Sequence, residues 1–177
     1  MSTTQVLIAG FGGQGILFAG KFLAYAGLLQ GRNVSWLPSY GPEMRGGTAN
    51  CSVILSDAQV GSPIVGRPDI LIAMNLPSLD KYEQEAPVGA SIFVDSSLVG
   101  RKVNRTDVSA YYIPATALAA EKGYDTLANM ILMGHVIAKT QVIPEEMIAP
   151  AMKKVVSARH ADLLEKNIEA LRLGFDY

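Results

Sequence analysis

The chain has 177 residues, 49% of them hydrophobic and 18% charged, and its 15 basic residues nearly balance its 16 acidic ones, giving a net charge of -1. Nucleic-acid binding through phosphates needs a clustered excess of basic residues, so that class is excluded. The single cysteine, Cys51, excludes an intramolecular disulfide and any zinc or iron–sulfur centre built from this chain alone.

The sequence also indicates where the protein works. No signal peptide is recognisable at the N-terminus, and no stretch reaches the ~20 apolar residues that span a bilayer, so we expect a protein of the reducing cytoplasm. The length fits a single domain over residues 1–177. The low charged fraction is typical either of a subunit with a buried face or of a compact α/β monomer. In the first case the isolated chain can homodimerise through that face.

Hydrophobic patterning predicts alternating strands and helices in the first two thirds of the chain. Residues 5–9 and 33–37 predict strands, and the helix between them, over residues 14–29, ends at Gly31. We interpret this arrangement as a parallel βαβ unit. The segment 48–55 alternates in polarity like a half-covered strand and can be an antiparallel addition. The other predicted elements are strands at 70–75, 91–95 and 108–113 and a short helix over 77–84.

The last third of the chain is predicted to be helical. A helix can begin at Pro114, and Asp125 or Thr126 can cap the apolar segment that follows, which should be central. The C-terminal helices occupy about 144–174, and the last one stops at Gly174. The predicted fold class is therefore α/β, a three-layer αβα sandwich with a Rossmann-like, mostly parallel sheet.

The glycines at positions 10, 12 and 15 match G-x-G-x-x-G between a strand and a helix, where free backbone N–H groups can hold phosphate. Dinucleotide binding would also need an acidic residue at the end of the second strand, and Ser35 to Pro38 provide none. Usual NAD binding is therefore disfavoured. Three interpretations stay open: a tight turn for packing alone, a site for another phosphate-bearing group, or contact with a partner's backbone.

A second glycine-rich loop, PSYGPEMRGG at 38–47, follows the second predicted strand, where a doubly wound sheet places its ligands. It carries Ser39, Tyr40, Glu43 and Arg45. The Arg45 guanidinium can bind phosphate or carboxylate in a forked geometry. The alternative is a surface turn in which Glu43 and Arg45 form a weak pair.

The remaining reactive side chains favour structural roles. Cys51 lies on the apolar side of its strand and is expected to be a small buried hydrophobe. His135 is expected to be a hydrogen-bonded core or interface histidine, and His160 a solvated one. The methionines of the C-terminal half are interpreted as core or interface residues. No acid–base pair or catalytic triad can be assembled, which favours a binding subunit over a self-sufficient enzyme.

Several segments of the chain together resemble one family. They are GFGGQG at 10–15, PSYGPEMRGGTANCSV at 38–53, Ser62-Pro63, Pro68-Asp69 with Asn75, Pro114-Ala115-Thr116 and Asn129-Met130 with Gly134. The chain is similar to the gamma subunit of 2-oxoacid:ferredoxin (acceptor) oxidoreductases. The form of the loop is most like the 2-oxoglutarate or branched-chain 2-oxoacid enzymes.

The resemblance implies a non-catalytic partner of alpha and beta subunits, with a ferredoxin-like delta subunit in some complexes and ferredoxin as electron acceptor. Thiamine diphosphate, Mg, iron–sulfur clusters and CoA would be bound on or with those partners, and this chain alone would hold no cofactor or metal. The implied role is in assembly and in shaping the route of CoA. The residues expected on that face are Gly12, Gly13, Gln14, Gly15, Ser39, Tyr40, Glu43 and Arg45. An autonomous nucleotide-binding reductase and a purely structural adaptor stay open as alternatives.

Overall fold

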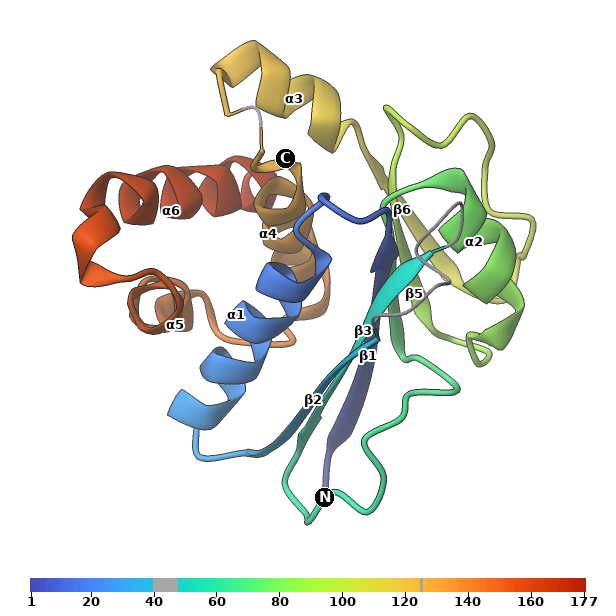
Figure 1. Ribbon diagram of the computed structural model, residues 1–177. Helices are drawn as coiled ribbons and strands as arrows, with labels where there is room; N and C mark the ends of the chain where they lie inside the picture. Colours follow the sequence, from blue (N-terminus) through green and yellow to red (C-terminus); the bar gives the residue numbers. More distant parts are fainter. Residues whose placement is uncertain (40–47, 125) are drawn as a thin grey trace.

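A computed structural model describes residues 1–39, 48–124 and 126–177 and shows a six-stranded sheet with helices on both faces (Figure 1). The strands are β1 (Thr3–Gly10), β2 (Asn33–Ser39), β3 (Ala49–Ser56), β4 (Ile70–Ala73), β5 (Ser91–Asp95) and β6 (Ser109–Ile113), in the spatial order β2-β3-β1-β4-β5-β6. The helices are α1 (Ile16–Leu29), α2 (Leu76–Tyr82), α3 (Ala115–Lys122), α4 (Ala128–Thr140), α5 (Ile148–Val155) and α6 (Ala161–Phe175). Short 3₁₀ turns cover Glu83–Glu85, Glu145–Met147 and Ala158–His160. The predicted αβα class is confirmed.

β3 is the antiparallel strand that the sequence suggested, and it pairs with both β1 and β2, with Ile8 opposite Cys51 and Trp36 opposite Val53. The pairs β1–β4, β4–β5 and β5–β6 are parallel. The predicted βαβ unit is wrong as a pair of adjacent strands, because β3 lies between β1 and β2. The consecutive strands β2 and β3 pair with each other, and β3 then takes the place beside β1.

Four helices, α1, α4, α5 and α6, cover one face of the sheet (Figure 1). Strand alternation sends Val6 and Ile8 into this layer and Leu7 to the other face. The methionines Met130, Met133 and Met152 are buried here, as expected.

The helices α4 and α6 cross in very close contact. A Cβ on Gly174 would lie 1.7 Å from the Ile131 carbonyl oxygen, and one on Gly134 would lie 1.9 Å from that of Leu171. The prediction that the last helix stops at Gly174 is therefore wrong, because α6 continues to Phe175 and uses the glycine for packing.

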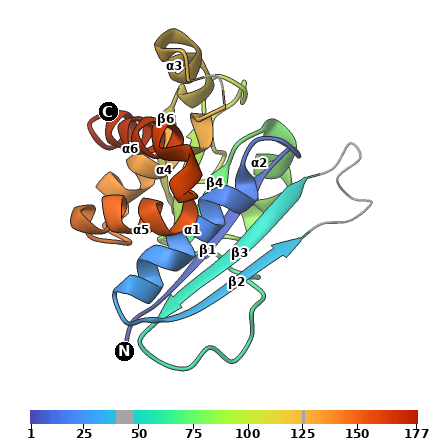
Figure 2. The ribbon, with the colours of Figure 1, turned by 60° about the vertical axis from the view of Figure 1, so that its left-hand side comes forward.

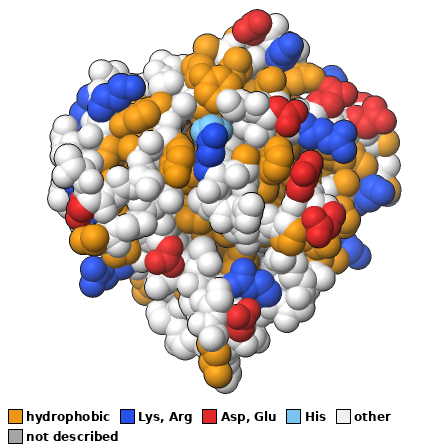
Figure 3. Space-filling model, turned by 180° about the vertical axis from the view of Figure 1, so that it is seen from behind, with side chains coloured by type: hydrophobic (Ala, Val, Ile, Leu, Met, Phe, Trp, Pro, Cys, Tyr) orange, Lys and Arg blue, Asp and Glu red, His pale blue; other side chains and the backbone are white. Residues whose placement is uncertain are grey.

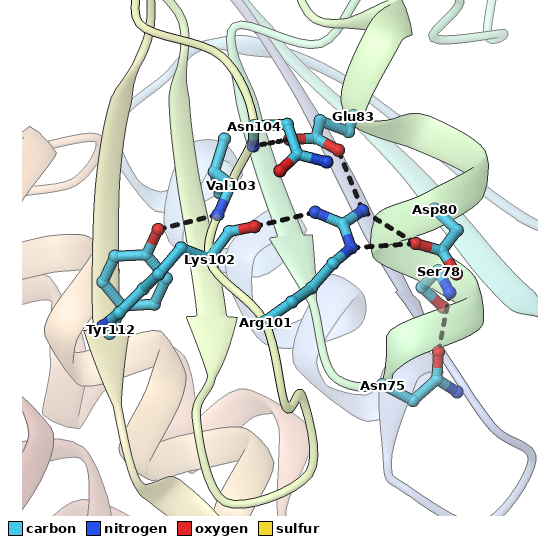
Figure 4. A network of polar contacts seen from close by, with 9 residues as sticks. All are labelled: Asn75, Ser78, Asp80, Glu83, Arg101, Lys102, Val103, Asn104 and Tyr112. Carbon is cyan, nitrogen blue, oxygen red and sulfur yellow. Dashed lines mark hydrogen bonds and ion pairs between the residues drawn. The ribbon is translucent and has the colours of Figure 1, made fainter.

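The opposite face is covered by α2 and by the segments 57–68 and 96–108. Asn75 caps α2 by accepting a hydrogen bond from the backbone N–H of Ser78 at 2.8 Å. The buried carboxylate of Glu83 accepts from Arg101 Nη2 at 2.9 Å and from the backbone N–H of Asn104 (Figure 4). These contacts fasten the 96–108 segment to the end of α2.

The start of α4 differs from the prediction. Its N-cap is Leu127, without a side-chain cap, so capping by Thr126 is wrong, and Asp125 lies outside the described residues. Leu127 packs against the core instead, so burial takes the place of a polar cap.

The surface has no single charge character on the side seen in Figure 3, where basic and acidic side chains are interspersed with apolar ones. Among the described residues, the helices are all too short or too polar to cross a membrane.

Candidate functional site

The glycine loop joins the end of β1 to the start of α1, as the sequence predicted. Gly13 and Gly15 have φ values of +88° and +74°, which residues with a Cβ rarely adopt. Gly15 is the N-cap of α1 and brings no side chain to cap the helix. Within the described part of the chain, no side chain caps the N–H groups of the first helical turn, where the positive end of the helix dipole also lies.

Gln14 braces the loop from inside. Its Oε1 accepts a hydrogen bond from the Phe11 N–H at 2.6 Å, and its Nε2 donates to the Met74 carbonyl oxygen at 3.1 Å. A Cβ on Gly10 would lie 2.6 Å from the same Oε1, so the glycine provides room for this brace. The amide of Gln14 therefore ties the loop to the end of β4.

Asn129, on α4, braces the other end of the loop. Its Nδ2 donates to the Gly15 carbonyl oxygen at 3.0 Å, and its Oδ1 accepts from the backbone N–H of Met130 at 2.9 Å. Asn129 is buried. The sequence pattern placed it in the resemblance but not in the site, and it lies too far along the chain for any local motif to connect it with Gly15.

A pocket of about 300 Å³ opens beside the loop, at the carboxyl end of β1. Its walls are apolar side chains and glycine backbone, and no charged side chain lines it among the described residues. Phe11 is 43% exposed beside it. The lining residues are Phe11, Gly12, Gly13, Gly15, Ile16, Leu17, Phe18 and Ala49.

The second loop leaves and re-enters the fold at this same edge. Ser39 ends β2 opposite Asn50, and Ala49, the first residue of β3, pairs with Gly10 and lines the pocket. Of the predicted site residues on this loop, Ser39 is described, whereas Tyr40, Glu43 and Arg45 lie outside the described residues. The structure thus brings Ser39 to the same sheet edge as the glycine loop.

The reactive side chains outside the loop have structural surroundings. Burial raises the pKa of the Cys51 thiol to about 12, as expected of a buried hydrophobe, although a hydrogen bond with Trp36 opposes the shift. His135 is buried among the rings of Phe93, Tyr111 and Tyr177. His160 is exposed, as predicted.

Asp95 is the one fully buried carboxylate at the carboxyl edge of the sheet, among the described residues, and the sequence analysis did not single it out. Its Oδ2 accepts from Thr116 Oγ1 at 2.6 Å, and its Oδ1 accepts from the Ser97 N–H at 3.1 Å. It therefore fixes the start of α3. Over residues 1–39, 48–124 and 126–177, no group of His, Cys, Asp and Glu could hold a metal ion.

The residues present fit one kind of group and not others. Free N–H groups at a helix start, with apolar walls beside them, suit a phosphate joined to an apolar or aromatic moiety. The end of β2 has no acidic side chain for a ribose, and one buried cysteine cannot ligate an iron–sulfur cluster. The fold and this pocket define an αβα domain with a glycine-loop pocket at the carboxyl end of β1.

Comparison with known proteins then gives the family. Residues 5–177 match the family model described as "Pyruvate ferredoxin/flavodoxin oxidoreductase", and the chain belongs to this family. The resemblance stated from the motifs is confirmed.

Two curated relatives show how this unit occurs in other proteins. The chain is 37% identical over 174 residues to the ketoisovalerate oxidoreductase subunit VorA of Methanothermobacter thermautotrophicus, covering 98% of this chain but only 36% of VorA. It is 33% identical to the 2-oxoglutarate synthase subunit KorC of Methanocaldococcus jannaschii, covering 97% of this chain and 92% of KorC. The unit thus forms about a third of one relative and nearly all of the other.

Solved structures share the fold. The gamma subunit of a keto/oxoacid ferredoxin oxidoreductase from Geobacter sulfurreducens superposes with a TM-score of 0.84 at 28% identity, covering 98% of this chain and 96% of that one. The 2-oxoglutarate:ferredoxin oxidoreductase of Magnetococcus marinus superposes with a TM-score of 0.87 at 22% identity, covering 99% of this chain and 31% of that one. The second likeness concerns the fold alone.

Proposed function

We propose that the chain is the gamma subunit of a multisubunit 2-oxoacid:ferredoxin oxidoreductase, which converts a 2-oxoacid and CoA to acyl-CoA and CO2 while reducing ferredoxin. KorC and the Geobacter gamma subunit support this proposal, because the matched region covers 92% of KorC and 96% of the Geobacter chain. Alpha and beta subunits, with a delta subunit in some complexes, would be its partners. Their thiamine diphosphate would supply the decarboxylation chemistry, and their iron–sulfur clusters would carry the electrons.

The role of this chain would be positioning. The pocket at the glycine loop is the observation that carries the proposal, because it joins unoccupied helix N–H groups to apolar walls. The pyrophosphate of CoA suits the N–H groups of Gly13 and Gly15, with Ser39, Tyr40, Glu43 and Arg45 on the adjoining segment. Holding CoA in place beside the partner subunits would raise the effective concentration of its thiol.

The decisive variant is Arg45→Ala in the assembled complex, with Arg159→Ala, an exposed arginine near α6, as the control. We expect Arg45→Ala to raise the Michaelis constant for CoA about tenfold, the cost of losing a charge-assisted hydrogen bond, with the complex intact. Weakened assembly with unchanged CoA dependence would instead identify a structural adaptor. Unchanged assembly, Michaelis constant and turnover would refute the role of Arg45.

The complex itself is tested by anaerobic affinity purification of the tagged chain from its native cells. We expect larger co-eluting chains, the visible absorption of iron–sulfur clusters and CoA-dependent oxidation of 2-oxoglutarate or a branched-chain oxoacid, with a substrate panel to decide between them. A colourless lone chain, obtained while the partner subunits are expressed and intact, would refute the proposal. Saturable NAD(P)H or flavin binding by that chain would favour the autonomous reductase.

We also place the complex in the cytoplasm, where its oxygen-sensitive chemistry and single free thiol are compatible with reducing conditions.

A further inference from the structure

The edge strand β2 lacks charged side chains, which are one of the usual protections of a free edge. Its sequence, NVSWLPS, has no charged residue, and no described strand lies beyond it (Figure 2). Edge strands commonly carry charges that prevent pairing with other chains. On β2 the apolar residues Trp36 and Leu37 are instead 39% and 37% exposed.

The other edge strand, β6, is better covered. The ring of Tyr111 stacks on Phe93 with centroids 4.7 Å apart, and Lys102 Nζ lies 4.0 Å from the centroid of the Tyr112 ring. The large side chains of β6 therefore already have partners in this chain. Of the two edge strands, β2 is therefore the better candidate for pairing with another chain.

The register of the sheet determines which backbone groups of β2 turn away from β3, toward the edge where no described strand lies. In an antiparallel pair, alternate residues turn their N–H and C=O groups toward the neighbouring strand. The Asp57 N–H donates to the Ser2 carbonyl oxygen at 2.9 Å, so the odd-numbered residues of β3 turn toward β1. Even-numbered residues of β2 lie opposite these, as Trp36 does opposite Val53, and turn toward the open edge. Pro38 agrees with this assignment, since it has no N–H and occupies an even position.

The groups that turn toward the open edge are arranged symmetrically about Trp36. Val34, Trp36 and Pro38 present their backbone to the open edge, and each has an uncharged, largely apolar side chain on the α1 face. A strand running antiparallel with the same sequence would place Trp36 opposite its own copy and Val34 opposite Pro38. The two Trp36 residues could exchange both backbone hydrogen bonds, and each Val34 N–H could donate to a Pro38 carbonyl oxygen.

We propose that β2 is the interface for a second copy of this chain, joined by a two-fold axis at Trp36 into one continuous sheet across both copies. Self-pairing brings no like charges together, and a two-fold contact closes on itself, whereas a contact between β2 and β6 would propagate. The exposed Leu28 and Leu29, at the end of α1 next to the start of β2, extend the apolar surface. A seven-residue strand buries less than the ~1,000 Å² of a stable interface, so the dimer dissociates on dilution. This inference is independent of the proposed function.

The test uses sedimentation velocity of the full chain over a range of concentrations. In the proposed register Ser35 of one copy lies beside Leu37 of the other, in a pair whose side chains are close. Ser35→Lys or Leu37→Glu alone places a charge in the interface and should abolish the dimer. The double variant Ser35→Lys/Leu37→Glu places opposite charges side by side at both ends and should restore it. Leu98→Lys, at a residue 44% exposed between β5 and β6, is the matched control and should leave the dimer intact.

Hydrogen exchange locates the contact independently of the variants. The amide hydrogens of Val34 and Trp36 should become protected as the dimer forms, and circular dichroism should show that every variant is folded. A chain that is monomeric at all concentrations overturns the proposal. So does a dimer that survives either single variant, or a folded double variant that stays monomeric. Protection of these amides in an assembled complex that holds one copy of the chain would also overturn it, by showing that a different subunit pairs with β2.

Discussion

The side-chain amide of Asn129 donates a hydrogen bond to the backbone carbonyl oxygen of Gly15 at 3.0 Å, so that α4 holds the turn at which the glycine loop becomes α1. The two residues are separated by 114 positions in the sequence. Gly15 must lack a Cβ for this contact, because a Cβ would lie 2.3 Å from Asn129 Nδ2. The shape of the candidate site therefore depends on a residue of the C-terminal half.

Gly15→Ala tests this contact, with Gly31→Ala as a closely matched control. Both glycines have φ of +74°, but nothing lies within 4 Å of a Cβ on Gly31. Each substitution should cost about 1–2 kcal/mol for the left-handed backbone. Gly15→Ala should cost a further ~1–3 kcal/mol for overpacking against Asn129, measured by urea unfolding. Equal losses for the two variants would show that the Asn129 side chain moves aside freely.

The crossing of α4 and α6 should be intolerant of any side chain. In Gly174→Ala the new Cβ meets the backbone of Ile131, which cannot rotate away, so we expect a loss at the upper end of overpacking effects, about 3 kcal/mol. Hydrogen exchange in α6 should accelerate more than in the strands. Gly100→Ala, where a Cβ meets open space, is the control and should change little. Similar unfolding curves for both variants would contradict the close contact seen here.

His135 should make stability depend on pH. Burial lowers its pKa below the ordinary 6.5, and the nearby charge of Lys139 lowers it further, while a hydrogen bond with the Gly174 backbone acts in the opposite direction. The unfolded chain therefore binds a proton at a pH where the folded chain does not. The contribution of His135 is complete above about pH 6.5 and is lost as the pH falls toward the folded pKa.

Urea unfolding at a series of pH values, repeated with His135→Gln, measures this contribution. The wild-type chain should lose stability as the pH falls below about 6.5, and the variant should lose less over the same series. His160→Gln alters an exposed histidine and should keep the wild-type slope. A pH dependence of stability that disappears in His160→Gln but persists in His135→Gln would contradict the prediction, because it would assign the effect to His160.

Glu83 should matter more to stability than a comparable surface carboxylate. Glu83→Gln removes the charge that accepts hydrogen bonds from Arg101 and from the Asn104 N–H, and we expect a loss of about 2 kcal/mol that added salt changes little. Asp107→Asn breaks the exposed pair with Arg105, which is 2.7 Å long, and should have a smaller, salt-sensitive effect. Chemical unfolding with and without sodium chloride compares the two. The prediction fails if the two variants lose the same amount.

Much of the fold could be predicted because local patterns reflect burial. The two-residue period of β3 places Cys51 and Ile54 on opposite faces, and the apolar circumference of α4 gives it a central position. Strand order could not be predicted, since nothing in the residues 33–56 states that β3 pairs with β1 as well as with β2. Gly174 was misread because a glycine that ends a helix and one that admits a neighbouring helix have the same local signature.

The candidate site could be predicted only in part for a related reason. The glycine loop is recognisable from its own residues and their position between a strand and a helix, and in the structure Gly13 and Gly15 have positive φ values. The hydrogen bonds that hold the loop in place have no such local signature. Gln14 contacts Met74, and Asn129 contacts Gly15, only once the sheet and α4 are assembled. The roles of Tyr40, Glu43 and Arg45 stay predictions.

The position of β1 between β3 and β4 has a consequence for how the chain matures during synthesis. The first strand made is central, yet its neighbours begin only at Ala49 and Ile70. Long-range pairing of this kind is slow, because the entropy of loop closure is lost before any contact offsets it. The glycine loop can form its hydrogen bonds only after Met74 and, much later, Asn129 have been synthesised. The part of the pocket that leaves the ribosome first is therefore the last to reach its final shape. In a chain truncated before α4, the glycine loop should lack its contact with Asn129 and should not adopt a single conformation.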